Sequence, residues 1–423
     1  MAEKLLSRNW GIENSHTVAV YRARGGYRAL EKALRTMTPV QIVEEVKASN
    51  LRGRGGAGFP TGTKWGFLPP PGDKPRYLVI NADEGEPATF KDRAIMEQDP
   101  HMLLEGIAIS AYALHVHRAY IYLRGEYRLS IERVESAIAE AAEADYLGDD
   151  ILGTGYRLEL TPFVGAGAYI CGEEMALLES MEGKKGWPRL KPPYPAQAGL
   201  FGCPTIVNNV ETMVCIPHIV ERGGRWFASL GTSKNGGMKL YAVSGHVERP
   251  GVYELPMGTR LRAVIESAGG VRGGKRIKAV IPGGASSQVL TEADLDLPMD
   301  FTSLQEAGSQ LGSAGIVVID EETDLVGVLE GLMAFYAHES CGQCTPCREG
   351  TAWAHRILER VSRGEGKPAD LDTLVEIADN MTGTTICPFG PGAAAPLKSF
   401  VLRFRDEFQR AVSVGAGRSG HGK

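Results

Sequence analysis

The segment "RYLVINADEGEPATFKDR" (Arg76–Arg93) decides how the chain is expected to fold. Its first five residues form a short apolar run between turn-forming residues, which predicts a buried strand. Asn81, Asp83, Glu84 and Glu86 follow that strand directly. Ligands of open α/β sheets bind at the carboxyl ends of parallel strands. We therefore expect these polar side chains to line a ligand site.

Strands and helices alternate on both sides of this segment. Thr38 and Pro39 occupy the N-cap and first-turn positions of one helix. Apolar runs and periodic stretches predict strands at 119–123 and 156–161, and helices at 38–50, 95–114, 130–148 and 171–183. Gly148 and Gly183 are expected to end the last two helices. The alternation predicts an α/β domain with a largely parallel sheet.

The pattern changes from about Lys239 onward. Two strands around "ERPG", a helix that ends in two glycines and two further strands predict a compact mixed unit, for which we favour a β-grasp. Four helices from Leu325 onward predict a small bundle. The expected divisions are 1–70 (N-terminal segment and glycine-rich loop, part of the first domain), 71–236 (α/β domain), 237–323 (β-grasp), 324–412 (helical domain) and 413–423 (disordered tail).

The composition excludes several classes of function. A net charge of -5 without a clustered Lys/Arg stripe argues against nucleic-acid binding. The sequence has no long uncharged apolar run and no signal peptide, so we expect an intracellular protein without direct membrane insertion. Any link to a membrane is expected to come through partners. The 53 glycines gather in short clusters, which indicates tight turns or close approach to a ligand.

Four of the seven cysteines form one set. Cys341, Cys344 and Cys347 have the spacing C-x₂-C-x₂-C, and Cys387 follows in the rigid loop "TICPFGPG". Three close cysteines and one remote cysteine are typical of an iron–sulfur cluster, and we favour a 4Fe–4S cluster. Zinc also accepts four cysteines, although two separated pairs are its usual arrangement. The remaining alternative is that the four side chains are simply buried.

The loop "GRGGAGFPTGTKWGF" (Gly53–Phe67) is rich in glycine and leaves successive N–H groups uncovered, which favours an anion such as phosphate. Arg54 and Lys64 add positive charge. Phe59 and Phe67 flank the loop and suit a flat heterocycle that carries phosphates. The loop is neither a Walker motif nor a dinucleotide fingerprint in its usual place. The alternatives are a plain turn and ordinary core packing of the two aromatic rings.

A second polar loop, "GAGAYICGEE" (Gly165–Glu174), follows another predicted strand, and "PTIVNNVET" adds Asn208, Asn209 and Thr212. Glu173 and Glu174 stand at a helix start, so helix capping is the alternative to a binding role. Paired amides both donate and accept, which fits the edge of a flavin. An acid beside an adenosine ribose would repel the 2′-phosphate of NADP. None of these side chains has the pattern of a nucleophile or general base, which indicates that bound cofactors carry the chemistry.

Taken together, these stretches and "WPRLKPPYPAQAGLFGC" resemble the NADH-binding flavoprotein subunit of respiratory complex I (the bacterial F subunit, the mitochondrial 51 kDa subunit), over about residues 15–412. The resemblance implies a Rossmann-like FMN domain, a β-grasp (ubiquitin-like) domain and a helical bundle that holds a 4Fe–4S cluster. It implies hydride transfer from NADH to FMN and single-electron transfer through the cluster toward quinone, so the expected activity is that of an NADH:quinone oxidoreductase.

The resemblance also assigns residues. FMN is implied to contact Gly53, Arg54, Gly55, Gly56, Lys64, Asn81, Asp83, Glu84, Gly172, Glu173, Val207, Asn208, Asn209 and Thr212. NADH is implied to contact Phe59, Phe67, Glu86, Tyr169, Glu174, Lys191 and Tyr194. We place Glu86, Glu173 and Glu174 at the catalytic centre, and the cluster on Cys341, Cys344, Cys347 and Cys387.

The implied partners are a thioredoxin-like 2Fe–2S subunit (24 kDa, E type) and a large multi-cluster iron–sulfur subunit (75 kDa, G type). The implied location is the peripheral arm of complex I, on the cytoplasmic side of the inner membrane or the matrix side in mitochondria. Two positions depart from the family. Met175 replaces a small residue, with an expected effect on packing behind the flavin, and Tyr194 stands where many members have Phe.

Three rival interpretations stay open at this point. The same core occurs in the diaphorase subunits of NAD-reducing hydrogenases and NAD-dependent formate dehydrogenases. A non-enzymatic scaffold stabilised by a metal or cluster would leave the glycine-rich and acidic loops unexplained. A ligand-binding module like the β-grasp part alone would not need Cys387.

Overall fold

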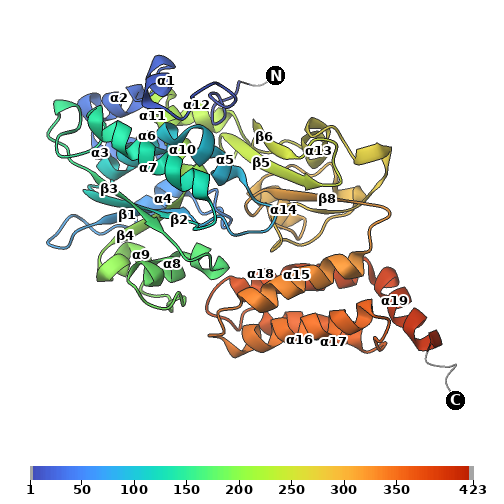
Figure 1. Ribbon diagram of the computed structural model, residues 1–423. Coiled ribbons are helices and arrows are strands. Elements are labelled where there is room, and N and C mark those ends of the chain that lie inside the picture. The colour runs from blue at the N-terminus through green and yellow to red at the C-terminus, as the bar shows by residue number, and fades with distance from the viewer. Residues whose placement is uncertain (1–2, 419–423) are drawn as a thin grey trace.

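The computed structural model describes residues 3–418, with side chains through 412. It has three parts in chain order, which are an α/β part, a smaller mixed sheet and a helical part (Figure 1). The helical part lies beneath the other two in that view, and its near end faces the α/β sheet. The fold class predicted from the sequence is confirmed.

The larger sheet is entirely parallel, with strand order β3-β2-β1-β4. Its strands are β1 (Tyr77–Ala82), β2 (Arg118–Leu123), β3 (Glu159–Val164) and β4 (Thr205–Asn209). Alternate residues of β1 enter different cores, with Leu78 and Ile80 on one face and Tyr77 and Val79 on the other. Because both faces are covered, β1 is buried along nearly its whole length.

Helices cover both faces of this sheet. They are α1 (Val18–Ala23), α2 (Arg28–Thr36), α3 (Pro39–Ala48), α4 (Thr61–Trp65), α5 (Lys91–Gln98), α6 (Pro100–Ala113), α7 (Arg128–Glu143), α8 (Glu174–Met181), α9 (Pro195–Ala198), α10 (Val210–Val214), α11 (Ile216–Arg222) and α12 (Gly224–Ser229). In Figure 1, α6 and α7 lie above the sheet, and α8 and α9 lie below it.

The predicted helix over 95–114 is two helices, α5 and α6, which separate at Asp99, and two further predicted boundaries in this part are wrong. α7 ends at Glu143 rather than at Gly148, because Asp145 already adopts a positive φ of 60° that a helix does not permit. β3 begins at Glu159 rather than at Tyr156, because the chain before it forms the isolated bridge between Gly148 and Leu158. Thr38 caps α3 as predicted, and a capping box with Gln41 completes that helix start.

The second sheet has the order β6-β5-β8-β7, with β5 and β8 parallel at its centre. Its elements are β5 (Met238–Gly245), β6 (Gly251–Pro256), β7 (Ile277–Ile281), β8 (Gly315–Asp320), α13 (Leu261–Ser267) and α14 (Phe301–Glu306). Tyr241 and Val243 of β5 pack with Leu261 and Val264 of α13 in a core of their own. This arrangement is the predicted β-grasp.

The helical part contains α15 (Leu325–Glu339), α16 (Thr345–Ser362), α17 (Asp370–Met381), α18 (Phe389–Arg403) and α19 (Arg405–Arg418). The last predicted helix is therefore two helices, which separate at Phe404. Residues 413–418 of the expected tail continue α19, and residues 419–423 lie outside the described part. Within residues 3–418, no helix combines the length and apolar composition needed to cross a bilayer.

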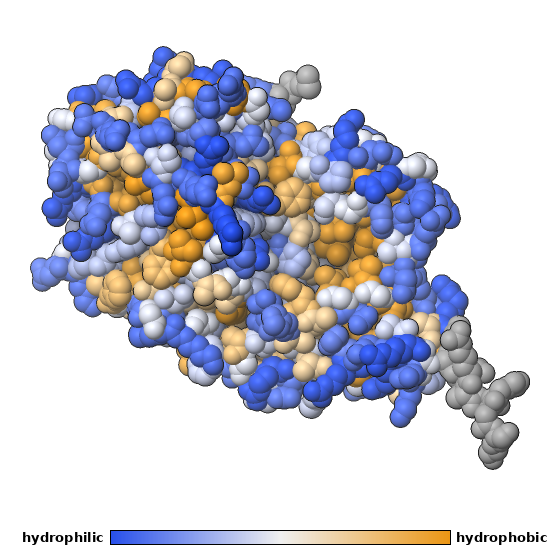
Figure 2. All heavy atoms as spheres, in the orientation of Figure 1, coloured by the Kyte–Doolittle hydropathy of each residue, from blue (hydrophilic) through white to orange (hydrophobic). Residues whose placement is uncertain are grey.

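The α/β and helical parts share one continuous core. Tyr77, Val79 and Met175 from the α/β part belong to the same buried cluster as Tyr336 and Phe389 from the helical part. The visible surface is largely hydrophilic, with apolar residues gathered toward the middle of the molecule where the parts meet (Figure 2). The departure at Met175 is thus accommodated by full burial in this shared core.

We predict that Gly106→Ala lowers the stability of the protein by about 2 kcal/mol, because a Cβ at Gly106 of α6 would lie 2.1 Å from the Met213 carbonyl oxygen of α10. The gain in helix propensity of about 1 kcal/mol does not offset this backbone clash. The midpoint of thermal unfolding measures the effect. Gly331→Ala on α15 is the control, since nothing lies within 4 Å of its Cβ, and it should leave the midpoint unchanged or raise it. An unchanged midpoint for Gly106→Ala would contradict the packing described here.

Candidate functional site

The polar loops predicted from the sequence meet at the carboxyl edge of the larger sheet. The Asn81 amide, at the end of β1, donates to the Gly172 carbonyl at 2.7 Å and accepts from the Asp83 N–H at 3.1 Å. Gly172 ends a short 3₁₀ turn, Tyr169–Gly172, just before α8. A Cβ at Gly172 would lie 3.3 Å from the Asp83 carbonyl oxygen, so glycine permits this close approach. Asn81 therefore joins the two acidic loops.

Two buried polar atoms at this edge point to a missing ligand. Among residues 3–412, Asp83 Oδ2 and Asn208 Nδ2 are buried and have no hydrogen-bond partner. Burial raises the pKa of Asp83 from 3.8 to about 7, because little compensates the charged form. An unpaired buried acceptor and donor cost free energy, so native proteins pair such atoms with something. A polar ligand that offers both a donor and an acceptor would satisfy them.

The Glu84 carboxylate already has partners within the protein, and its predicted contact with the cofactor stays a prediction. The carboxylate accepts from the backbone N–H groups of Asp92 and Arg93, at 2.9 and 3.0 Å, and so caps the start of α5. The Tyr127 hydroxyl also donates to it. Burial and the neighbouring Asp92 carboxylate raise the pKa of Glu84 to about 7.

The Arg54 side chain does not add its charge to the glycine-rich loop, although the sequence had predicted that it would. The guanidinium turns inward from the glycine-rich loop and donates to the Gly236 and Met238 carbonyls at 2.8 and 3.1 Å. Only the backbone of Arg54 stays at the loop, where its N–H donates to the Thr212 hydroxyl at 2.9 Å. Lys64 is thus the cation of the predicted pair that remains at the site.

Lys64 and Lys191 form a charged group with the paired acids. Lys64 Nζ lies 2.9 Å from one oxygen of Glu174, and Lys191 Nζ lies 2.8 Å from the other and 3.0 Å from Glu173. Burial alone would raise the pKa of Glu174, but the two ammonium groups outweigh it and lower that pKa to about 2. Glu173 also caps α8 by accepting a hydrogen bond from the Met175 N–H. The same side chain therefore both caps a helix and lies beside the other site residues.

Glu86 and Tyr169 bind one another across the two loops. The Tyr169 hydroxyl donates to Glu86 Oε2 at 2.5 Å, and the Ser286 N–H of the β-grasp part donates to Glu86 Oε1 at 2.7 Å. Burial raises the pKa of Glu86. The Tyr169 backbone N–H donates to Glu339 at the end of α15, at 3.2 Å. All three parts of the chain therefore contact this pair of side chains.

The glycine-rich loop packs against the end of β4. A Cβ at Gly55 would lie 3.0 Å from Asn209 Cβ, whereas Gly56 has a φ of +130° and open space around it. Asn209 is fixed, because its amide donates to Asp92 and accepts from the Glu211 N–H. Val207 lies buried in the same strand. Gly53 closes the loop by donating its N–H to Phe59 at 2.8 Å.

Three aromatic side chains stand exposed near this loop and beside Lys191. Phe59, Phe67 and Tyr194 are 46%, 54% and 54% exposed, which is high for large aromatic residues. The Phe59 and Phe67 rings lie 5.8 Å apart at 49°. These exposures argue against the core-packing alternative for the two phenylalanines. The two rings form a small apolar platform open to solvent.

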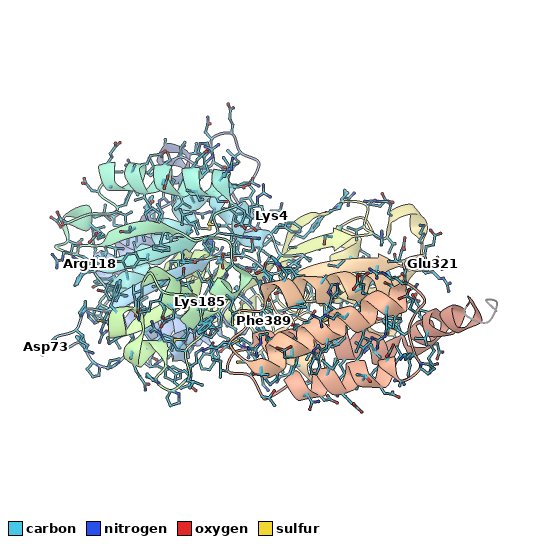
Figure 3. The ribbon with its side chains drawn as sticks, turned by 60° about the horizontal axis from the view of Figure 1, so that its bottom comes forward. Lys4, Asp73, Arg118, Lys185, Glu321 and Phe389 are labelled. Carbon is cyan, nitrogen blue, oxygen red and sulfur yellow. The ribbon has the colours of Figure 1, made fainter. Side chains whose placement is uncertain are left out.

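The four predicted ligand cysteines line one cavity in the helical part, where the α15–α16 and α17–α18 connections meet. Its lining consists of Ser340, Cys341, Gln343, Cys344, Cys347, Thr385, Cys387 and Phe389. Phe389 and Lys185 both lie near the middle of the molecule, where the helical and α/β parts meet (Figure 3). Burial raises the pKa of Cys387 to about 12, so four thiolates here would require a strongly positive centre.

The four cysteines share this cavity, but among residues 3–412 no three His, Cys, Asp or Glu side chains are close enough together to hold one metal ion. The choice of a cluster over zinc therefore rests on the spacing of the cysteines in the sequence.

Family models match three consecutive segments of the chain. Residues 46–218 match the Nuo51 FMN-binding domain, 240–289 match the SLBB domain, and 327–411 match the iron–sulfur binding region of NADH-ubiquinone oxidoreductase F. The first covers the glycine-rich and acidic loops, and the third contains all four cysteines.

Among curated proteins, the second NADH-quinone oxidoreductase F subunit of Rhizobium meliloti is 55% identical over 409 residues, covering 96% of this chain and 97% of that protein. The chain belongs to the family of NADH-quinone oxidoreductase F subunits. The F subunit of Escherichia coli is 49% identical over 395 residues, covering 93% of this chain and 89% of that protein. The resemblance noted in the sequence is therefore confirmed.

A solved structure of an NAD⁺-reducing [NiFe]-hydrogenase, in the H₂-reduced state, is also similar. It has a TM-score of 0.84 and 37% identity, covering 94% of this chain and 67% of that one. The fold of the F-subunit family is therefore shared with a hydrogenase chain, as the first rival interpretation expected.

Sequence reasoning missed several residues that hold the site of this F-subunit family member together. Three of them could have been found from the sequence, because they lie inside or beside the quoted motifs, namely Lys91, Asp92 and Glu211. Ser286 and Lys239 carried none, because they reach the site from another part of the chain only through the fold.

We predict that Asp83→Asn raises the stability of the cofactor-free protein by about 1–3 kcal/mol at pH 8, since it removes an unpaired buried charge. The folded-state pKa of Asp83 is raised, so its penalty grows as pH rises from about 4 to about 7 and is complete above that range. Unfolding midpoints at pH 5.5 and pH 8 test this, with a larger gain expected at pH 8. Asp73→Asn, at an exposed position, is the control. Equal gains in stability at both pH values would show that the Asp83 carboxylate carries no buried, unpaired charge in the folded protein.

Proposed function

We propose that the chain is the NADH dehydrogenase subunit of a respiratory NADH:quinone oxidoreductase, which binds FMN, NADH and a 4Fe–4S cluster. The family supports this activity through the named F-subunit relatives and the FMN-binding and iron–sulfur models. The observation that carries the proposal is the pair of unpartnered buried atoms, Asp83 Oδ2 and Asn208 Nδ2, at the carboxyl edge of the sheet in the described residues. A flavin edge alternates donors and acceptors and would satisfy both.

Each loop would hold a different portion of the cofactors. The N–H groups of Gly55 and Gly56 would face the FMN phosphate together with Lys64, and Asp83, Asn208 and Asn209 would bind the ring system. The proposed FMN contacts also include Gly53, Arg54 (through its backbone), Asn81, Gly172, Glu173, Val207 and Thr212, with Glu84 acting indirectly as the cap of α5.

NADH would lie over the same edge. Phe59 and Phe67, with Tyr194, would stack on adenine, while Glu86 and Tyr169 would bound the nicotinamide side. Glu174, held ionised by Lys64 and Lys191, would accept from ribose hydroxyls and repel a 2′-phosphate. These side chains position the dinucleotide and exclude water, and none acts as a nucleophile.

FMN, when bound, accepts a hydride and returns its electrons singly, which couples a two-electron donor to one-electron acceptors. Cys341, Cys344, Cys347 and Cys387 would hold the cluster that receives those electrons. Tyr169 lies between the acidic loop and this cavity, with its ring in edge contact with Phe389, which lines the cavity. The short path through packed side chains suits electron transfer.

Electrons would leave to other subunits of the complex. The proposed partners are the thioredoxin-like 2Fe–2S subunit and the large multi-cluster iron–sulfur subunit, in the arm that projects from the inner membrane on its cytoplasmic or matrix side. The second candidate function, favoured by the similar hydrogenase fold, is the diaphorase subunit of an NAD-reducing hydrogenase. Higher identity to the F-subunit relatives, 55% against 37%, supports the first.

The visible spectrum of the anaerobically purified protein, before and after one equivalent of NADH, tests the function. We expect a flavin band that bleaches with NADH, because the site is built to bring the two cofactors together, and loss of the broad cluster absorption. The same amount of NADPH should bleach the flavin far more slowly. A colourless protein that ignores NADH would overturn the proposal.

We predict that Cys387→Ser removes the electron paramagnetic resonance signal of the reduced 4Fe–4S cluster but leaves flavin reduction by NADH, because the cysteine lies in the cluster cavity and not among the flavin contacts. Cys203→Ser is the matched control, since Cys203 is partly buried but does not line that cavity. An intact signal in Cys387→Ser would refute the ligand assignment.

A further inference from the structure

Five charged side chains form a fully enclosed group behind the proposed flavin site. We call Arg54, Lys91, Asp92, Glu211 and Lys239 the buried ionic network, and each is no more than 2% exposed. They come from the glycine-rich loop, α5, α10 and β5, so the network spans the α/β and β-grasp parts.

The network is continuous through one carboxylate. Glu211 Oε2 lies 2.6 Å from Lys239 Nζ and 3.0 Å from Lys91 Nζ, and Lys91 Nζ lies 2.7 Å from Asp92 Oδ1. Glu211 Oε1 also accepts from the Leu240 N–H at 3.0 Å. Arg54 joins through charge alone, since within residues 3–412 its guanidinium makes no ion pair and donates to backbone carbonyls.

Stability alone does not account for this arrangement. Removing ionised groups from water costs several kcal/mol for each ion, and apolar side chains of similar size are often at least as stabilising. Lys91 also stands at the first residue of α5, where the helix dipole disfavours a cation. A group of charges that is costly in both respects is more readily explained by a role at the adjacent site.

The network contacts that site directly. Asp92 Oδ2 accepts from the Asn209 amide at 2.6 Å, and the Arg54 N–H donates to Thr212. Both partners are proposed flavin residues. The charges of the network therefore lie directly behind two proposed flavin-binding side chains, in a region without solvent to screen them.

The network carries more positive than negative charge. Arg54, Lys91 and Lys239 face the carboxylates of Asp92 and Glu211. Burial would raise the pKa of Glu211, but Lys239, Lys91 and Arg54 lower it to about 2, so it stays ionised. The network itself contains three cations and two carboxylates, so with all five groups ionised it has an excess of one positive charge.

We propose that the buried ionic network sets the redox preference of the flavin site, because its excess positive charge favours the reduced form of bound FMN over the oxidised form. Hydride transfer from NADH would bring two electrons and one proton and leave NAD⁺ behind, so a bound FMN would gain one negative charge. Lys239 contributes to this charge from the β-grasp part, where its ammonium lies 2.6 Å from Glu211. This inference rests on the proposed function.

The test is the ratio of dissociation constants for oxidised FMN and dithionite-reduced FMN, measured on the full chain. Measurements are made at pH 6, because burial lowers the pKa of Lys239 to about 7 and the ammonium must be protonated. Lys239→Met should weaken binding of reduced FMN relative to oxidised FMN by roughly tenfold, the order of effect of removing one unit charge from a buried region of low effective dielectric constant.

Charge and structure are separated by a second variant. Lys239→Met combined with Glu211→Gln removes one charge of each sign, so it should return the ratio to within about twofold of the wild-type value although the ion pair is lost. Lys278→Met is the matched control, because Lys278 lies on β7, at the edge of the second sheet, and pairs with Glu407, so it should leave the ratio unchanged. Where Lys239→Met fails to fold, Lys91→Met replaces it and should shift the ratio in the same direction.

The proposal is overturned if the single variant leaves the ratio unchanged, or if the double variant stays where the single variant put it. The second result would mean that the network acts only by holding the structure. Failure of the proposed function is a distinct result, because the wild-type chain would then bind neither form of FMN.

Discussion

Tyr169 is the point on which the arrangement of the three parts depends. Its hydroxyl binds Glu86 from the first acidic loop, its backbone N–H binds Glu339 of α15, and Glu86 in turn accepts from Ser286 of the β-grasp part. The Tyr169 ring packs against Phe335, Tyr336 and Phe389 of the helical part. A site that passes electrons from a flavin to a cluster requires the two to stay close, and this side chain fixes the elements that would hold them.

Most acids around the site already have protein partners. Glu84 caps α5, Glu86 binds Tyr169, Glu173 caps α8 and Glu174 binds two lysines. Only Asp83 among the acids of these loops keeps a buried oxygen without a partner in residues 3–412. The helix-capping alternative and the binding interpretation are therefore not exclusive, because the capping bonds hold the loops in the shape that leaves Asp83 and Asn208 for a ligand.

The sequence predicted this edge of the sheet well and the direction of individual side chains poorly. A strand followed by polar residues places backbone at a known position, so the meeting of Asn81, Asp83 and Gly172 was accessible from the pattern. Spacing does not state where a loop side chain points, and Arg54 turned away from the anion nest while Glu84 turned toward α5. Helix ends showed the same limit, since Asp145 ends α7 in a conformation usually left to glycine.

Local sequence patterns do not predict contacts between distant segments, and in this protein such contacts support the proposed site residues. The proposed FMN residues fall within the α/β part, yet Glu86 depends on Ser286, Tyr169 depends on Glu339, and Glu211 depends on Lys239. An isolated α/β domain would keep the quoted glycine-rich, acidic and amide loops and lose each of these supports, so Glu211 would lack the Lys239 cation and Glu86 its backbone donor. The proposed reaction site therefore lies at the junction of the three parts rather than within the α/β segment alone.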